Sequence, residues 1–259
     1  MKTQPPPYDF SRFFDRVLVI SLSRATDRQE AVKRQLAPGS FDWIRAVDKR
    51  TLQTDDDSFG GEVDTAASRR HHPVGKKIQP GEVAVSLSHR LAYETLLKNN
   101  WKSILILEDD FVVDANKIGL LESMCKELPP DWDVWYLGFD KRSEQPRHWF
   151  LKKNFYLLLN RLGLRKQYAA ETLRHFYPQP WSAHLRTAGF HDCLHAYAVS
   201  RRAAESLFLA QRPVRYVADH LVAHQVTDGT LRGFISMPPL IHQPEQLSKE
   251  SVFSYRKND

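Results

Sequence analysis

The stretch that most constrains the fold is residues 103–113, which read SILILEDDFVV. A short, continuous run of Ile and Leu of this kind indicates a strand that is buried on both faces, as in parallel sheets covered by helices. Three carboxylates, Glu108, Asp109 and Asp110, follow the apolar run directly. Buried carboxylates are costly unless they are paired, hydrogen-bonded or bound to a metal, so this strand end needs partners.

Two interpretations of the acidic triplet are open. In open α/β sheets, ligands bind outside the carboxyl ends of the strands, so the acids are well placed to hold a hard divalent cation and a phosphorylated ligand. Alternate residues of a strand share one face, and Glu108 and Asp110 can therefore converge on one ion. The other interpretation is a strand that simply runs into a solvated acidic turn.

The remaining apolar pattern alternates strands with helices. Thr26 is expected to cap a helix that Pro38-Gly39 stops, and further helices are expected at 80–100, 115–128 and 201–211. Strands are expected at 16–22, 41–47, 133–139, 194–200 and 231–237. This alternation predicts one α/β domain over 1–259, with a mainly parallel, Rossmann-like sheet flanked by helices. Residues 1–14 are expected to be an extended leader, and 49–79 a long polar loop.

The predicted helix from Pro80 carries two different stripes. Val83, Leu87 and Leu91 recur at helical spacing and form an apolar row. Glu82 and His89 share another stripe of the same helix, and both need partners if that helix is buried. His89 is then either a hydrogen-bonded core histidine or a side chain that faces a ligand pocket.

Residues 141–189 interrupt the alternation with basic and aromatic sequence. Within them, 150–166 read FLKKNFYLLLNRLGLRK, which is compatible with an amphipathic helix on an anionic membrane surface. A helical lobe that is inserted in the chain and packs on the sheet is the alternative, and the pattern slightly favours it.

Charge and composition limit the partners. The net charge is +6 and the pI about 9.3, which suits acidic partners such as phosphorylated substrates or anionic lipid. No nucleic-acid recognition motif is evident, so nucleic acid is not expected as a partner. No segment approaches the roughly 18 apolar residues of a membrane span, there is no apolar signal core, and there are two cysteines. These features predict a cytoplasmic protein.

Several pieces together resemble glycosyltransferase family 25, which includes lipooligosaccharide and collagen galactosyltransferases. The pieces are VISLSRATDR, GEVAVSLSHRLAYE, ILILEDDFVV, HAYAVSRRAAESL, VADHLV and PPLIHQ, in that order, followed by Ser251 where a late Ser is common. The chain departs from the family pattern at Ser21, which stands where Asn is usual, and in its long basic insertion. Both departures concern the acceptor more than the reaction.

The resemblance implies a GT-A-like fold and an inverting, metal-dependent transfer of a hexose, most often galactose, from a UDP-sugar. Manganese, or magnesium, is the implied cofactor. Asp110 is then the expected direct metal ligand, with Glu108 on the metal or the ribose, and His242 near the C-terminus is a candidate further ligand. Asp109 is expected to face either the donor sugar or the other side of the pleat. Asp219 is the expected base, unless it caps the following helix instead.

The same resemblance places the remaining candidates around the donor. Arg24 and Arg28 follow the first strand, where an arginine can form a fork onto phosphate or an ion pair on a helix surface. Glu82 and His89 are expected to line the donor or acceptor pocket.

The resemblance also implies an acceptor, namely a glycan or glycolipid of the cell envelope such as lipooligosaccharide. The protein would then work on the inner face of the bacterial inner membrane. Two other functions remain open: a metal-dependent phosphoesterase, and a catalytically inactive protein that binds glycan or nucleotide.

Overall fold

A single mixed sheet forms the centre of the protein, for which a computed structural model describes residues 7–72, 75–140, 142, 144–164 and 168–243. Its strand order is β2-β1-β3-β8-β5-β9-β7-β6. Within the described residues, only β8 and β7 run against the common direction, which confirms the predicted mainly parallel sheet. The strands are β1 (Arg16–Ser21), β2 (Phe41–Arg45), β3 (Ser103–Glu108), β5 (Val134–Gly138), β6 (Gln179–Pro180), β7 (Leu185–Thr187), β8 (Ala196–Ser200) and β9 (Gly233–Ser236).

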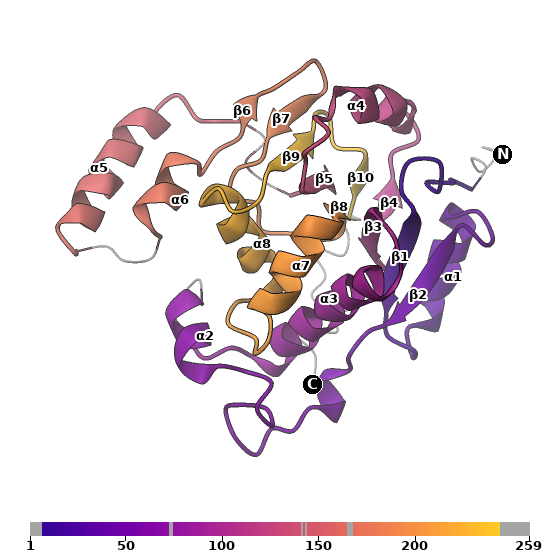
Figure 1. The fold of residues 1–259 in the computed structure, drawn as a ribbon, viewed down its shortest axis with the longest axis horizontal. Helices are drawn as coiled ribbons and strands as arrows, with labels where there is room; N and C mark the ends of the chain where they lie inside the picture. The colour runs from indigo at the N-terminus through magenta and orange to yellow at the C-terminus, as the bar shows by residue number, and fades with distance from the viewer. Residues whose placement is uncertain (1–6, 73–74, 141, 143, 165–167, 244–259) are drawn as a thin grey trace.

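Helices cover both faces of this sheet (Figure 1). One face packs against α3 (Pro80–Lys98), α7 (Arg201–Ala210) and α8 (Ala218–Thr227). The other packs against α1 (Thr26–Gln35) and α4 (Leu121–Glu127). A short antiparallel ribbon of β4 (Val112–Val113) and β10 (Ile241–His242) lies beside the carboxyl end of β3. The result is a three-layer α/β domain with an apolar core on each face of the sheet and a smaller third cluster beside α3.

Strand β3 shows why the sequence folds in this way. Its Ile104 and Ile106 side chains belong to the core on the α3 side, whereas Leu105 and Leu107 belong to the core on the α1 side. Alternate residues of a strand point to opposite faces, so a strand that is apolar at every position requires cover on both. The prediction of a doubly buried strand ending in three acids is confirmed.

The basic insertion forms a lobe that begins at the carboxyl end of β5 and ends at the amino end of the neighbouring antiparallel strand β8. It contains α5 (Trp149–Arg161) and α6 (Ala170–Arg174), followed by the β6-β7 hairpin, which extends the sheet beyond β9. The chain leaves β5 at Gly138 and enters β8 at Ala196, and these two residues are paired across the sheet. The predicted helical lobe is therefore present, with two short strands that the sequence did not indicate.

Some boundaries differ from the predicted ones. Ala25 is the N-cap of α1, so Thr26 is the first helical residue rather than the cap. The predicted leader is shorter than expected, because Phe10 and Phe14 are buried in the core on the α1 side. Residues 1–6 and Ser251 lie outside the described residues.

The connections also carry more structure than the sequence indicated. The predicted polar loop contains a 3-10 turn, η1 (Lys49–Thr51), and a helix, α2 (Thr65–His71). The helix predicted from residue 115 begins with another 3-10 turn, η2 (Ile118–Leu120). Among the described residues, no helix is long and apolar enough to cross a membrane.

Candidate active site

The acidic triplet lies where several strand ends meet. Parallel pairing places Ile20 of β1 opposite Glu108 of β3, so Ser21 ends its strand next to the acids. From the other side, antiparallel β8 begins at the same edge, and the Glu108 backbone N–H donates to the carbonyl of His195 at 2.9 Å. This edge therefore combines the carboxyl ends of β1 and β3 with the amino end of β8, as expected for a ligand site in an α/β sheet.

Asp109 is held by two neighbours from the first strand and helix. The Ser21 hydroxyl donates to Asp109 Oδ2 at 2.7 Å, and Arg28 Nη1 donates to Asp109 Oδ1 at 2.8 Å. The same guanidinium nitrogen lies 3.5 Å from Asp110 Oδ2. Arg28 therefore partly neutralises the triplet, and Ser21 fixes the carboxylate between the other two acids.

Asp110 has an unusual environment for a carboxylate. Burial, together with the nearby Glu108 charge, raises its pKa to about 6, although the Arg28 charge opposes the rise. The amide of Gln243 donates to Asp110 Oδ1 at 3.1 Å. Two like charges held together in a mostly buried place favour a bound cation, because it relieves their repulsion.

Glu108 is joined to a buried chain of polar side chains. His89 Nε2 lies 3.4 Å from Glu108 Oε1, and His89 Nδ1 lies 2.8 Å from the hydroxyl of Tyr197. The Tyr197 hydroxyl lies 2.8 Å from the hydroxyl of Tyr93. His89, Tyr93 and Tyr197 are all buried. His89 is thus both a hydrogen-bonded core histidine and a residue that touches the acidic motif.

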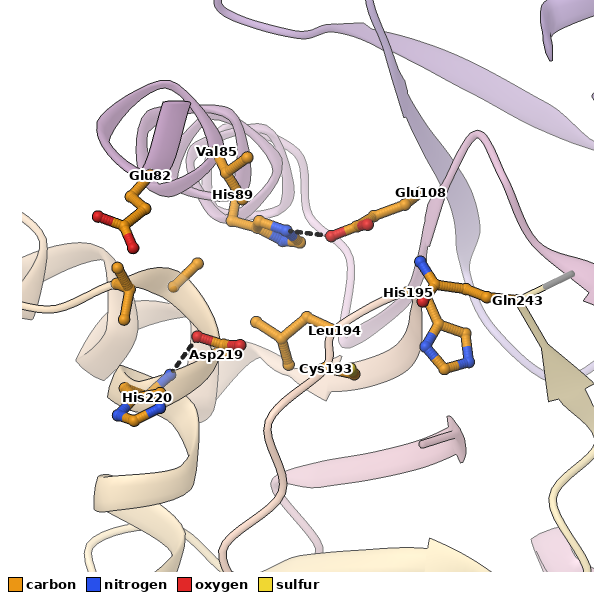
Figure 2. Close-up of a pocket in the computed structure, with 12 residues that line it drawn as sticks. Glu82, Val85, His89, Glu108, Cys193, Leu194, His195, Asp219, His220 and Gln243 are labelled. Atoms are coloured by element: carbon orange, nitrogen blue, oxygen red, sulfur yellow. Dashed lines mark hydrogen bonds and ion pairs between the residues drawn. The ribbon is translucent and has the colours of Figure 1, made fainter. Parts of the chain in front are cut away.

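A pocket opens between Glu108 and helix α8, and Figure 2 shows its lining. Helix α3 contributes Glu82, Val85 and His89, and α8 contributes Asp219 and His220. The remaining wall comes from Glu108, the segment 193–195, the residues 217–218 at the start of α8, and Gln243. The pocket therefore brings together residues from five of the sequence motifs that resembled the family pattern.

Asp219 lies across this pocket from Glu108 (Figure 2). The N-cap of α8 is Val217, so Asp219 stands in the first helical turn and is not the cap. Its Oδ1 accepts a hydrogen bond from the backbone N–H of His220 at 2.8 Å. A half-buried carboxylate on the pocket wall, at a helix N-terminus, has the placement that a base facing a bound hydroxyl requires.

Three predicted residues have other partners nearby. Arg24 Nε pairs with Asp48 at 2.8 Å. Glu82 accepts from the backbone N–H of Gln79 at 2.7 Å, which holds the start of α3. His242 Nε2 lies 3.4 Å from Asp114 Oδ2, while its neighbour Gln243 reaches Asp110. The roles predicted for Arg24, Glu82 and His242 stay predictions.

Sequence reasoning did not select two residues of the site. Gln243 is the last residue of the motif PPLIHQ, and His195 is the first residue of HAYAVSRRAAESL. His195 is buried, its Nε2 lies 3.4 Å from the carbonyl oxygen of Ile241, and its ring lines the pocket. The signal that could have identified Gln243 as a site residue is that it is polar and ends a motif that resembles the family pattern.

The family comparison decides the identity of the domain. Residues 14–222 match the family model described as "Glycosyltransferase family 25 (LPS biosynthesis protein)". The chain belongs to glycosyltransferase family 25. The matched family 25 segment includes the acidic triplet and Asp219, whereas Gln243 lies beyond it.

Relatives within family 25 include proteins described both as enzymes and as inactive. The chain is 30% identical over 141 residues to "Probable inactive glycosyltransferase 25 family member 3" of Bos taurus, covering 52% of the chain and 24% of the relative. It is 28% identical over 131 residues to "Procollagen galactosyltransferase 1" of Danio rerio, covering 48% and 21%. The chain thus spans less than a quarter of the length of these relatives.

Proposed function

We propose that this protein is an inverting glycosyltransferase that moves a hexose, galactose foremost, from a UDP-sugar to a hydroxyl group of a glycan. The observation that carries the proposal is the pocket itself. Glu108 of the acidic triplet and Asp219 line this pocket from opposite sides, and both fall within the segment that matches family 25. Membership of the family together with this geometry favours group transfer over binding alone.

The acids are suited to a divalent cation that is shared with the substrate. In the described residues, no group of three or more His, Cys, Asp or Glu side chains has the arrangement of a complete metal site. Mg²⁺ and Mn²⁺ in nucleotide sites, however, are commonly bound through one or two carboxylates together with substrate phosphates. Glu108 and Asp110 supply that pair of oxygen ligands, and His242 is a further candidate. A cation bound there would act as a Lewis acid on the leaving diphosphate.

The transfer reaction assigns a role to each side of the pocket. The acceptor oxygen attacks C1 of the sugar, the bond from C1 to the diphosphate oxygen breaks, and the acceptor proton passes to the Asp219 carboxylate. Arg28 and Arg24 lie beyond the end of β1, where their charge favours the phosphates. Ser21 holds Asp109 toward the donor sugar, and His89 holds Glu108. Attack from the side opposite the leaving group inverts the anomeric carbon.

The acceptor we propose is a glycan or glycolipid of the cell envelope, such as lipooligosaccharide. The family description as an LPS biosynthesis protein and the basic character of the chain support this choice. The site of action would be the cytoplasmic side of the inner membrane, with the protein bound peripherally.

A titration of UDP by calorimetry tests the site. We expect wild-type protein to bind UDP more tightly with Mn²⁺ than without it, and Asp110→Ala to lose the Mn²⁺-dependent part. Asp131→Ala is the matched control, because Asp131 pairs with Arg232 at the surface away from the pocket. Loss of binding in both variants, or no UDP binding by wild type, would refute the donor site.

One alternative has a specific observation in its favour. Several relatives are described as inactive, so a family 25 domain can exist without turnover. Binding of UDP-galactose to wild type without transfer to any acceptor sugar would favour this reading. Hydrolysis of the donor that no added acceptor diverts would favour a phosphoesterase.

A further inference from the structure

Helix α5 has two apolar faces, and only one of them packs on the protein. Its inner face carries Trp149, which is buried and lies 5.3 Å from Phe176 and 4.7 Å from Tyr177 between ring centroids. Tyr156, two turns along, contacts Trp149 at 6.2 Å. These aromatic contacts attach the helix to the inserted lobe and account for the apolar residues on that side.

The outer face carries four further apolar side chains that are exposed. They are Leu151, Phe155, Leu158 and Leu162, with exposures of 72%, 56%, 53% and 60%. Their spacing of 4, 3 and 4 residues places them in one stripe along the helix. We call these four residues the α5 stripe. A contiguous exposed apolar patch on a helix indicates a site that binds a membrane or another protein.

Charge indicates which partner covers the stripe. Six Lys or Arg residues and no Asp or Glu occur between positions 145 and 170. At about 100° per residue, Lys152 and Arg161 lie roughly 90° to either side of the stripe, and both are exposed. An apolar stripe bordered by basic residues on both sides is the pattern of a helix that lies in an anionic lipid interface.

A second copy of the chain fits this surface less well. A symmetric dimer through the α5 stripe would bring the Lys152 and Arg161 side chains of both copies together, and like charges at close range repel. The helix has 13 residues, about 20 Å of length, which suits a helix lying along a surface rather than crossing a membrane.

We propose that α5 is a membrane-docking helix, whose stripe enters the headgroup region of an anionic bilayer while its basic borders contact lipid phosphates. In Figure 1, α5 is the outermost helix of the lobe, and α6 lies between it and α8. Helix α8 carries Asp219. The docked lobe would therefore hold the acceptor side of the pocket at the lipid surface; this consequence, unlike the docking itself, rests on the proposed function.

Sedimentation with vesicles tests the docking without any turnover. We expect the full chain to bind phosphatidylcholine vesicles that contain phosphatidylglycerol, and to bind pure phosphatidylcholine far more weakly. Leu151→Ser/Phe155→Ser/Leu158→Ser should weaken binding about tenfold or more, because the inserted apolar area is removed. For single changes, Leu151→Ser should weaken binding and Leu209→Ser should not, although Leu209 on α7 is comparably exposed at 67%.

Two double variants, each lacking two positive charges, test whether the basic residues beside the α5 stripe contribute to vesicle binding. Lys152→Gln/Arg161→Gln should reduce binding about tenfold at low salt, and Lys98→Gln/Lys126→Gln should leave it unchanged. Both control lysines are exposed on other helices, and both double variants lower the net charge by the same amount. Calorimetric UDP titration of the stripe variant should match wild type, which separates docking from the donor site.

Three outcomes would overturn the proposal. The first is wild-type protein that does not sediment with anionic vesicles. The second is equal binding to both kinds of vesicle, which would remove the role of charge. The third is a wild-type dimer that the stripe variant converts to a monomer, which would assign the stripe to a second copy of the chain.

Discussion

The buried chain from Glu108 through His89 and Tyr197 to Tyr93 makes a quantitative prediction about one hydroxyl group. Tyr197→Phe removes the hydroxyl that lies 2.8 Å from both His89 Nδ1 and the Tyr93 hydroxyl. Both of those groups are buried and would lose this partner. Leaving a buried polar group unpaired costs about 1–3 kcal/mol, so we expect the free energy of unfolding to fall by about 2–4 kcal/mol.

The neighbouring strand offers a matched control. Tyr136 of β5 pairs with Tyr197 across the sheet and is equally buried. Its hydroxyl has no hydrogen-bond partner among the described residues. Tyr136→Phe removes the same atom from the same core without breaking a hydrogen bond, so stability should change by less than about 0.5 kcal/mol or increase.

Urea denaturation followed by tryptophan fluorescence measures both variants. The reasoning predicts a lower midpoint for Tyr197→Phe and an unchanged midpoint for Tyr136→Phe, with equal slopes. Equal destabilisation by both changes would refute it, since loss of a hydroxyl would then matter regardless of its partners. The UDP titration adds a second readout, because a Glu108 carboxylate with a displaced His89 should bind the Mn²⁺ complex less tightly.

Three further predictions concern the pocket and the core. Asp219→Asn should lower kcat about 10²–10⁴-fold while changing the Kd for UDP by less than about threefold, and a fully active variant would remove Asp219 as the base. Gly138→Ala should lower the melting temperature, because an added Cβ would overlap the backbone oxygen of Ile241 in β10. Gly119→Ala, with nothing within 4 Å of the added Cβ, should not; equal melting temperatures would contradict this packing. Burial lowers the pKa of His224 from 6.5 to about 4. Below pH 6.5 the unfolded chain therefore binds a proton at His224 that the folded chain does not bind. The free energy of unfolding should fall by up to about 2 kcal/mol from pH 7.5 to 5. His224→Phe should flatten that dependence in denaturation experiments and exposed His148→Gln should not; the same pH profile in all three proteins would show that other groups cause the loss.

The parts of the fold that depend on strong apolar periodicity were predictable. The buried strand at β3 needed only the run of Ile and Leu and the acids that end it. The long helix α3 needed Pro80 and its apolar row. Asp219 was found from a short motif, and the structure places it on the pocket wall. In each case, one local pattern and one general packing rule sufficed.

The residues that sequence reasoning missed depend on contacts across the sheet. Whether His242 or Gln243 reaches the acids is decided by the register of β10 on β4, where His242 pairs with Val112. A shift of one residue would exchange the two side chains, and no local pattern specifies that register. The β6-β7 hairpin was missed for a similar reason, because strands of two and three residues carry too little periodicity to detect.

The pairing of Gly138 with Ala196 has a consequence for how a family 25 domain can diversify. The segment between these two positions starts and finishes at adjacent points on the sheet, so its outer part, α5 and α6, can change as a unit. Its length and sequence can change while the donor half, built from β1, β3 and α3, keeps its register. A chimaera that exchanges this outer part between two family members should retain the donor preference of its sheet and acquire the acceptor preference of its lobe.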